Sequence, residues 1–133
     1  MHRRQFSALA AACAATPFAP LARAQGAWPQ KAISWVVPFP PGGITDTTSR
    51  ALGKRMGELL GQQIVIENRP GAGGSLGTEQ VARAAPDGYT WLYGTQGTMA
   101  ANLALYKNLK YDPLKDFVPV HGMLLSPTVL VVE

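Results

Sequence analysis

Cysteine, histidine and charge are all scarce in this chain of 133 residues. The one cysteine, Cys13, lies within the first 24 residues, so residues 25–133 can form no disulfide, thiolate metal site or cysteine nucleophile. No apolar run reaches the ~18 residues that a membrane-spanning helix needs. Charged residues make up only 15% of the chain and hydrophobic residues 47%, which is typical of a folded protein and excludes a disordered one.

The formal net charge of +4 comes almost entirely from the N-terminus. Arg3, Arg4 and Arg23 precede the first acidic residue, and from Gln25 onward 9 basic residues nearly balance 8 acidic ones. The basic isoelectric point therefore describes the first 24 residues. We expect no nucleic-acid partner, because such partners require a basic surface on the folded domain.

Residues 1–24 have the features of an export signal. Arg3 and Arg4 form a positive start, residues 6–15 are apolar and rich in alanine, and Ala22-Arg23-Ala24 is a small-x-small cleavage site. We expect cleavage after Ala24 and a mature chain of residues 25–133 in a bacterial periplasm. The arginine pair leaves the twin-arginine export route open beside ordinary secretion.

In the mature chain, β-rich runs alternate with helical patterns. The expected strands are residues 33–37, 63–67 and 90–93, and the expected helices run from Thr45 or Asp46 to Leu60, from Ser75 to about Ala84 and from Thr98 to Leu105. Two further strands are expected at 117–125 and 128–133. Strands that alternate with helices predict an α/β fold with a mostly parallel sheet and right-handed crossovers.

The first expected helix has one apolar face. Leu52, Met56, Leu59 and Leu60 have the spacing of a single helical stripe, so we expect them to be buried. Gly61 is well placed to end the helix.

Glycines concentrate in the three loops that lead from strand to helix, at residues 38–43, 68–74 and 94–97. In a parallel sheet these loops emerge at the same carboxyl edge, which is where open α/β sheets bind ligands. Helix N-termini point free N–H groups toward that edge and favour an anion. The loops therefore predict capture of a small anion.

Reactive side chains are few in the mature chain. His121 lies in an expected strand, which favours a structural role, and Ser75 and Thr98 are better helix caps than nucleophiles. Asp46 is the one carboxylate in the loops, and it either complements the helix dipole or contacts a ligand hydroxyl or amine. No spaced cluster of His, Cys and acids is present, so we expect no metal and no cofactor.

The second loop, Gly71-Ala72-Gly73-Gly74-Ser75-Leu76-Gly77, invites comparison with nucleotide-binding loops. It lacks the Gly-Lys-Ser/Thr ending of a P-loop, and Leu76 occupies the last glycine position of G-x-G-x-x-G. A fragment of a nucleotide-binding α/β enzyme is the first alternative function. The second is a truncated remnant that binds nothing.

Three segments in order resemble one receptor family: Val37-Pro38-Phe39-Pro40-Pro41-Gly42-Gly43-Ile44-Thr45-Asp46, Glu67-Asn68-Arg69-Pro70-Gly71-Ala72-Gly73-Gly74 and Ala85-Pro86-Asp87-Gly88-Tyr89-Thr90. They are similar to the substrate-binding receptors of tripartite tricarboxylate transporters, the Bug-type receptors. The resemblance implies a monomeric periplasmic binding protein of type II that is not an enzyme. Its two domains would close on a small carboxylate or amino acid and present it to membrane permease subunits.

The resemblance also implies which positions face the ligand. These are Phe39, Pro41, Gly42, Gly43 and Asp46 in the first loop, Gly73 and Gly74 in the second, and Thr95, Gln96 and Thr98 in the third. Ile44 and Met99 depart from the family pattern, so the identity of the solute stays open.

Family members have roughly 300 residues, near the size at which chains divide into two domains. We therefore expect residues 25–133 to be the N-terminal part of the first domain, truncated.

Overall fold

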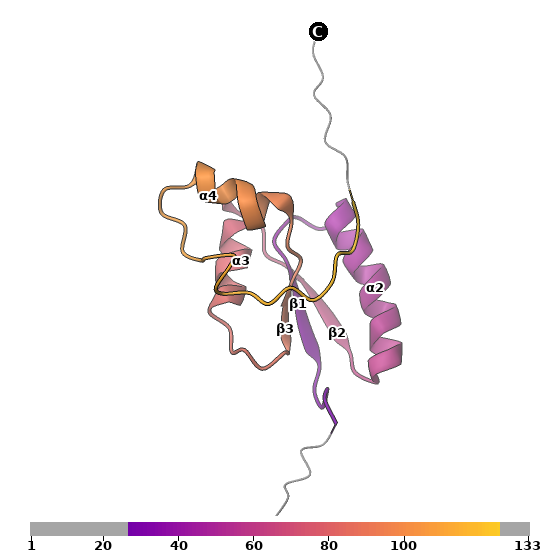
Figure 1. Ribbon diagram of the computed structural model, residues 1–133. Coiled ribbons are helices and arrows are strands. Elements are labelled where there is room, and N and C mark those ends of the chain that lie inside the picture. Colours follow the sequence, from indigo (N-terminus) through magenta and orange to yellow (C-terminus); the bar gives the residue numbers. More distant parts are fainter. Residues whose placement is uncertain (1–26, 126–133) are drawn as a thin grey trace, which may run out of the picture.

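A parallel three-stranded sheet lies at the centre of the computed structural model, which describes residues 27–125 (Figure 1). The strands are β1 (Ile33–Val37), β2 (Ile64–Asn68) and β3 (Thr90–Leu92), in the order β2-β1-β3. Both neighbours run parallel to β1, and Trp35 lies opposite Ile66 on one side and Trp91 on the other. The predicted α/β fold with a parallel sheet is confirmed.

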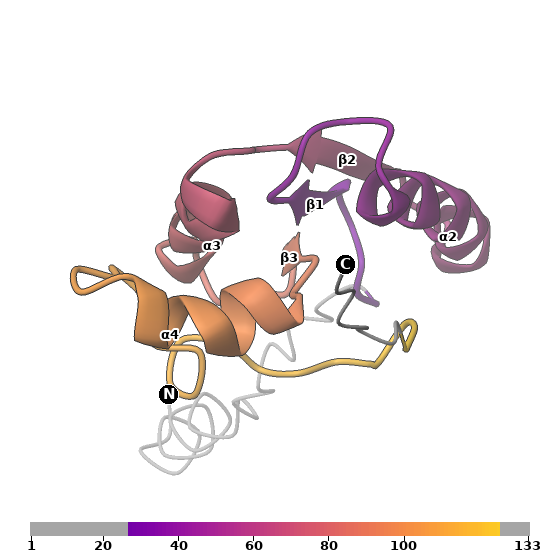
Figure 2. The ribbon, with the colours of Figure 1, turned by 90° about the horizontal axis from the view of Figure 1, so that it is seen from above.

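The two longer helices cover opposite faces of the sheet. These are α2 (Ile44–Leu60) and α3 (Ser75–Ala82), as the view from above shows (Figure 2). Right-handed crossovers require this arrangement, because β2 and β3 flank β1 on different sides. A 3₁₀ turn (Ala72–Gly74) precedes α3, and a π-helical turn (Gly97–Ala101) continues into the short α4 (Asn102–Leu105). The three strand-to-helix loops therefore share one edge of the sheet.

The core lies on the sheet face that α2 covers. Trp35, Val37 and Tyr93 are buried there, and Met56 of α2 packs against them. The Trp35 and Tyr93 rings are stacked with centroids 6.5 Å apart, and Trp91 meets Trp35 edge-on at 5.8 Å. These aromatic pairs fix the register of β1 and β3.

The helix face that packs on the sheet matches the predicted one only in part, since Met56 packs on the core and Leu60 is half-buried. Leu52 is 37% exposed and Leu59 69% exposed, whereas the buried residues of α2 include Ser49 and Gly53. A Cβ on Gly53 would lie 3.3 Å from Cδ1 of Ile66. The small residues let the helix approach β2 more closely than leucines would, so close packing decided which face is buried.

The ends of the helices were predicted only in part. Gly61 ends α2 with a left-handed φ of +67°, as expected. Neither Thr45 nor Asp46 caps α2, and Ser75 does not cap α3: both helices begin after a glycine, without a side-chain cap. In α2 the Gly43 carbonyl accepts from Asp46 and Thr47, the third and fourth residues of the helix. In α3 the Ala72 carbonyl of the preceding turn accepts from Ser75.

The segment 117–125 is irregular, so the strand predicted there is wrong. Val118 and Val120 are each 87% exposed, and His121 is exposed as well, while Met123 packs on the Trp35 cluster. A strand needs a neighbour to accept its backbone hydrogen bonds, and no strand among residues 27–125 pairs with this segment.

Two further predictions fall outside the described residues. These are the export signal at 1–24 and the strand at 128–133. Within residues 27–125 no helix combines the length and apolar character that crossing a bilayer requires.

Candidate functional site

The three glycine-rich loops converge at Gly74. This residue has a φ of +88°, and a Cβ on it would lie 2.7 Å from Cγ2 of Thr98 and 3.3 Å from Cζ of Phe39. Phe39 belongs to the first loop and Thr98 follows the third, so one glycine of the second loop is in contact with both. The topology predicted this meeting at the carboxyl edge (Figure 2).

The structure divides the predicted ligand-facing positions by exposure. Asp46, Gly74 and Thr98 are buried, Phe39 and Thr95 are half-buried, and Pro41, Gly42, Gly43, Gly73 and Gln96 are exposed. The exposed positions present mainly backbone to solvent. The buried ones sit where the loops are joined to the helices and to one another.

Asp46 is 4% exposed and is held inside the first turn of α2. Its Oδ2 accepts a hydrogen bond from the Gly42 N–H at 2.8 Å, and its Oδ1 lies 2.9 Å from Nη2 of Arg50. The Arg50 guanidinium and the Gly42 N–H lower the pKa of Asp46 to about 2. The carboxylate is therefore ionised and paired at neutral pH. Direct contact between Asp46 and a ligand stays a prediction.

Arg50 extends this pairing to the end of β2. Its Nη2 donates to Oδ1 of Asn68 at 2.9 Å, and Nδ2 of Asn68 donates to the Phe39 carbonyl at 3.1 Å. The chain of contacts from Asp46 through Arg50 and Asn68 to Phe39 is called the loop clamp below. It ties the first loop to α2 and to β2. The sequence reasoning missed Arg50 and Asn68, although the i, i+4 spacing of Asp46 and Arg50 was a usable signal.

The first N–H groups of α2 are open. Within residues 27–125 nothing accepts the N–H groups of Gly43, Ile44 and Thr45, because the Asp46 carboxylate is bonded to Gly42 instead. This helix has 17 residues, and its N-terminal end carries a partial positive charge. The open groups are therefore a favourable place for an anion.

The first N–H groups of α3 are not open, contrary to the prediction. Gly74 N donates to the Gly71 carbonyl at 2.9 Å, and Ser75 N donates to the Ala72 carbonyl. A phosphate-binding loop leaves such N–H groups to the ligand. The geometry of the second loop therefore does not favour a nucleotide.

Side chains of the third loop and α4 lock this edge. Oγ1 of Thr98 accepts from Thr95 N at 3.0 Å, and Oγ1 of Thr95 accepts from Thr98 N at 3.3 Å. This reciprocal pair resembles a capping box in which Thr95 is the capping residue and Thr98 the third residue. The prediction that Thr98 itself caps the helix is therefore wrong. Nδ2 of Asn102 donates to the Gly73 carbonyl at 3.1 Å and to Oγ of Ser75 at 3.0 Å, which joins α4 to the second loop.

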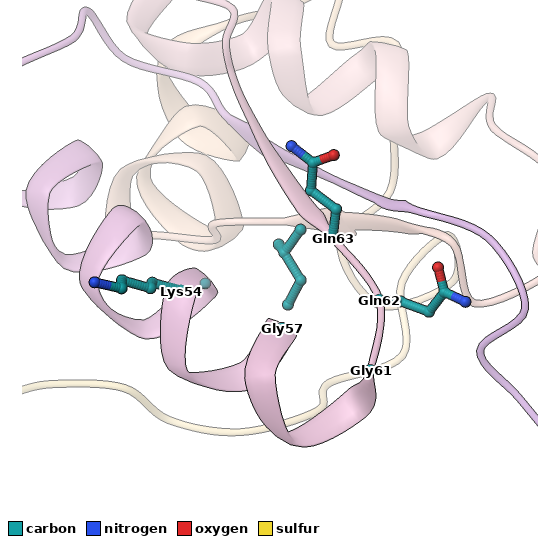
Figure 3. A pocket seen from close by; sticks show the side chains of 7 residues that line it. Lys54, Gly57, Gly61, Gln62 and Gln63 are labelled. Atoms are coloured by element: carbon teal, nitrogen blue, oxygen red, sulfur yellow. The ribbon is translucent and has the colours of Figure 1, made fainter.

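Other features of the surface offer less chemistry. A hollow of about 420 Å³ lies at the other end of α2 (Figure 3) and is lined by Gly53, Lys54, Gly57, Gly61, Gln62, Gln63 and Ile64. Lys54 is the one charged residue of its lining. Within residues 27–125 no group of three or more His, Cys, Asp and Glu side chains could hold a metal. The glycine-loop edge is therefore the candidate site.

Comparison with known proteins gives consistent matches. The model of the tripartite tricarboxylate transporter family receptor matches residues 48–133. Protein BugT of Bordetella pertussis is 43% identical over 105 residues, which are 78% of this chain and 32% of BugT. MatC from Rhodopseudomonas palustris, solved with bound malate, superposes with a TM-score of 0.67 at 49% identity, over 70% of this chain and 32% of MatC. A second R. palustris protein, solved with adipate, superposes with a TM-score of 0.63 at 41% identity, over 65% of this chain and 29% of that one.

These matches bear directly on the predicted resemblance. The chain spans about a third of the length of the relatives it matches. The fold is that of part of a periplasmic binding protein. The matching family is one of receptors and not of enzymes. Since the family model covers most of the sequence, the chain belongs to the tripartite tricarboxylate transporter receptor family.

Proposed function

We propose that this chain is part of a periplasmic receptor that captures a small carboxylate for a tripartite tricarboxylate-type transporter. The observation that carries the proposal is the open start of α2, where the N–H groups of Gly43, Ile44 and Thr45 are free within residues 27–125. A carboxylate suits these donors by charge and by hydrogen-bonding capacity. Malate and adipate, the ligands of two structural relatives, are both dicarboxylates.

The predicted positions then have two kinds of role. We propose that the exposed ones contact the solute, with half-buried Phe39 and Thr95 at the margin of the site. Asp46, Gly74 and Thr98 are buried and act by holding the loops in place. Catalysis is not part of the proposal, because the hydroxyls of Thr95 and Thr98 bond to each other and to backbone groups.

The wider organisation follows from the family. We propose that residues 25–133 are the first part of the first of two domains, and that the rest of the receptor supplies the opposite wall of the site. Export with cleavage after Ala24, a monomeric state and delivery of the solute to membrane permease subunits complete the proposal. The shared third of the relatives' length and the family match support it.

An NMR titration of the chain with malate and adipate tests the function. We expect the amide signals of Gly43, Ile44 and Thr45 to shift, because a carboxylate bound there changes their hydrogen bonding. Gly61 and Gly88 lie at the other edge of the sheet and serve as internal controls that stay in place.

Malamide, the uncharged diamide of malate, is the matched ligand control. It has nearly the same shape as malate but carries no anionic group. Shifts that malamide reproduces, or the absence of any shift with both dicarboxylates, would show that the start of α2 is not a carboxylate site in this chain.

A further inference from the structure

A negatively charged side chain lies next to the place where the proposed ligand would bind. Asp46 is the third residue of α2, and its carboxylate lies beside the turn whose N–H groups are open. An acid in this position stabilises the helix, because it complements the positive end of the dipole. The same charge repels any other anion that approaches this end. A carboxylate site therefore needs something that cancels the charge of Asp46.

Arg50 is placed to do this. One turn along α2, its Nη2 lies 2.9 Å from Oδ1 of Asp46 and donates to Oδ1 of Asn68 at 2.9 Å. Asn68 is itself anchored, because its amide donates to the Phe39 carbonyl at 3.1 Å. The guanidinium is thus held between the helix and the end of β2.

The loop clamp also determines which N–H groups at the start of α2 stay free. The Asp46 carboxylate takes the Gly42 N–H at 2.8 Å, which leaves Gly43, Ile44 and Thr45 for a ligand. Without Arg50 the carboxylate would lose its ion pair, and the Asn68 contact with the first loop would lose its support. Both charge and loop position at the site then depend on Arg50.

We propose that Arg50 is a positioning residue for solute capture: it neutralises Asp46 and, with Asn68, holds the first loop so that the start of α2 accepts an anion. The proposal rests on the proposed function of this edge. It assigns Arg50 and Asn68 a role by way of Asp46 and the loop, without contact between either side chain and the solute.

The same helix provides a matched control. Arg55 pairs with Glu58 at 2.9 Å, but both side chains are more than half exposed and neither is bonded to a loop of the site. Arg50→Gln and Arg55→Gln therefore remove the same positive charge from the same helix. Only the first removes the ion-pair partner of the Asp46 carboxylate.

The test measures the affinity of the chain for malate by NMR titration. Arg50→Gln should weaken binding about fivefold, which is the size of a like-charge repulsion at about 4 Å with the full screening of bulk water. Arg55→Gln should bind as the native chain does. The double variant Asp46→Asn/Arg50→Gln should recover most of the lost affinity, because it removes the uncompensated charge.

The double variant separates charge compensation from a purely structural role. If Arg50 served only to hold the fold, removal of Asp46 as well would not restore binding. Native-like affinity in Arg50→Gln, or a double variant no better than Arg50→Gln, would therefore overturn the proposal. Thermal melts of each variant show whether it is folded.

Asp46→Asn alone provides a second route if Arg50→Gln does not fold. This variant keeps the guanidinium and loses the carboxylate charge, so it should bind malate at least as tightly as the native chain. A tenfold loss would show instead that the Asp46 carboxylate itself supports capture, by contact with the solute or by its bond to Gly42, and would overturn the proposal. Absence of binding by the native chain is a different result, since it overturns the proposed function and this role with it.

Discussion

Gly74→Ala is the sharpest test of the convergence of the three loops. The added methyl would lie 2.7 Å from Cγ2 of Thr98, 3.3 Å from Cζ of Phe39 and 3.4 Å from the Pro38 carbonyl. These neighbours belong to two other loops and are packed on both sides. The methyl therefore has no free space, and one of the loops must move.

Two separate terms make up the cost. A residue with a Cβ at φ +88° pays about 1–2 kcal/mol for the left-handed backbone. Forcing a methyl into a packed contact adds about 1–3 kcal/mol. The sum of about 2–5 kcal/mol would lower the melting midpoint of a domain of this size by roughly 10 °C or more.

Gly42→Ala isolates the packing term. Gly42 has the same φ of +88°, but a Cβ on it would meet nothing within 4 Å. The two variants then share the cost of the positive φ, and the methyl contact is present only at Gly74. Melts followed by circular dichroism should give a Gly74→Ala midpoint several degrees below that of Gly42→Ala. Equal midpoints would refute the argument that the loops are tightly packed around Gly74.

Three further changes test individual contacts. Because the pKa of Asp46 is lowered from 3.8 to about 2, its stabilisation should be complete above about pH 4 and fall as the pH drops toward 2. Asp46→Asn should remove this contribution of Asp46 to the pH dependence of the unfolding free energy. Urea titrations at pH 2 to 5 would measure the free energy for both proteins. The same pH profile in the variant and the native chain would contradict the pairing with Arg50. Thr98→Val should cost about 1–2 kcal/mol in urea denaturation, since Thr95 N loses its acceptor, and a cost below about 0.5 kcal/mol would show that this pair is dispensable. Tyr111→Phe should cost about 1 kcal/mol by the same assay, because its hydroxyl donates to the buried Thr98 carbonyl at 2.6 Å, and no change would mean that another donor replaces it.

The sequence predicted the parts of the fold that depend on local pattern and on topology. Alternation of β-rich runs with helical stretches was enough to place β1, β2 and β3, and the handedness of crossovers placed their loops on one edge. The strand prediction for segment 117–125 was wrong because apolar residues form a strand only where a neighbouring strand can pair with them. The predicted apolar face of α2 was right for Met56 and wrong for Leu52 and Leu59, because hydrophobic spacing does not show how closely a helix can approach a sheet.

The site was predicted in outline and missed in detail. The glycine loops could be recognised because three sequence segments end their strands in the same way. The loop clamp could not, since Asn68 is 29 residues from Phe39 and 18 from Arg50, and no local pattern joins them. The internal use of the α3 N–H groups was equally hidden, because it depends on the backbone turn at Ala72–Gly74.

Backbone donors and side chains have different tasks at this edge. In the proposed function, the open N–H groups of Gly43, Ile44 and Thr45 would recognise an anionic group whatever the rest of the molecule is, because every carboxylate presents the same two oxygens. Glycines at the convergence keep the loops close together but add no chemistry that distinguishes one solute from another. Under that proposal, discrimination would come from the side chains that remain accessible beside the donors, Phe39, Thr95 and Gln96 among the described residues, and from the proposed opposite wall. A loop edge of this kind can keep its carboxylate capture unchanged while its solute preference is altered by a few substitutions around it.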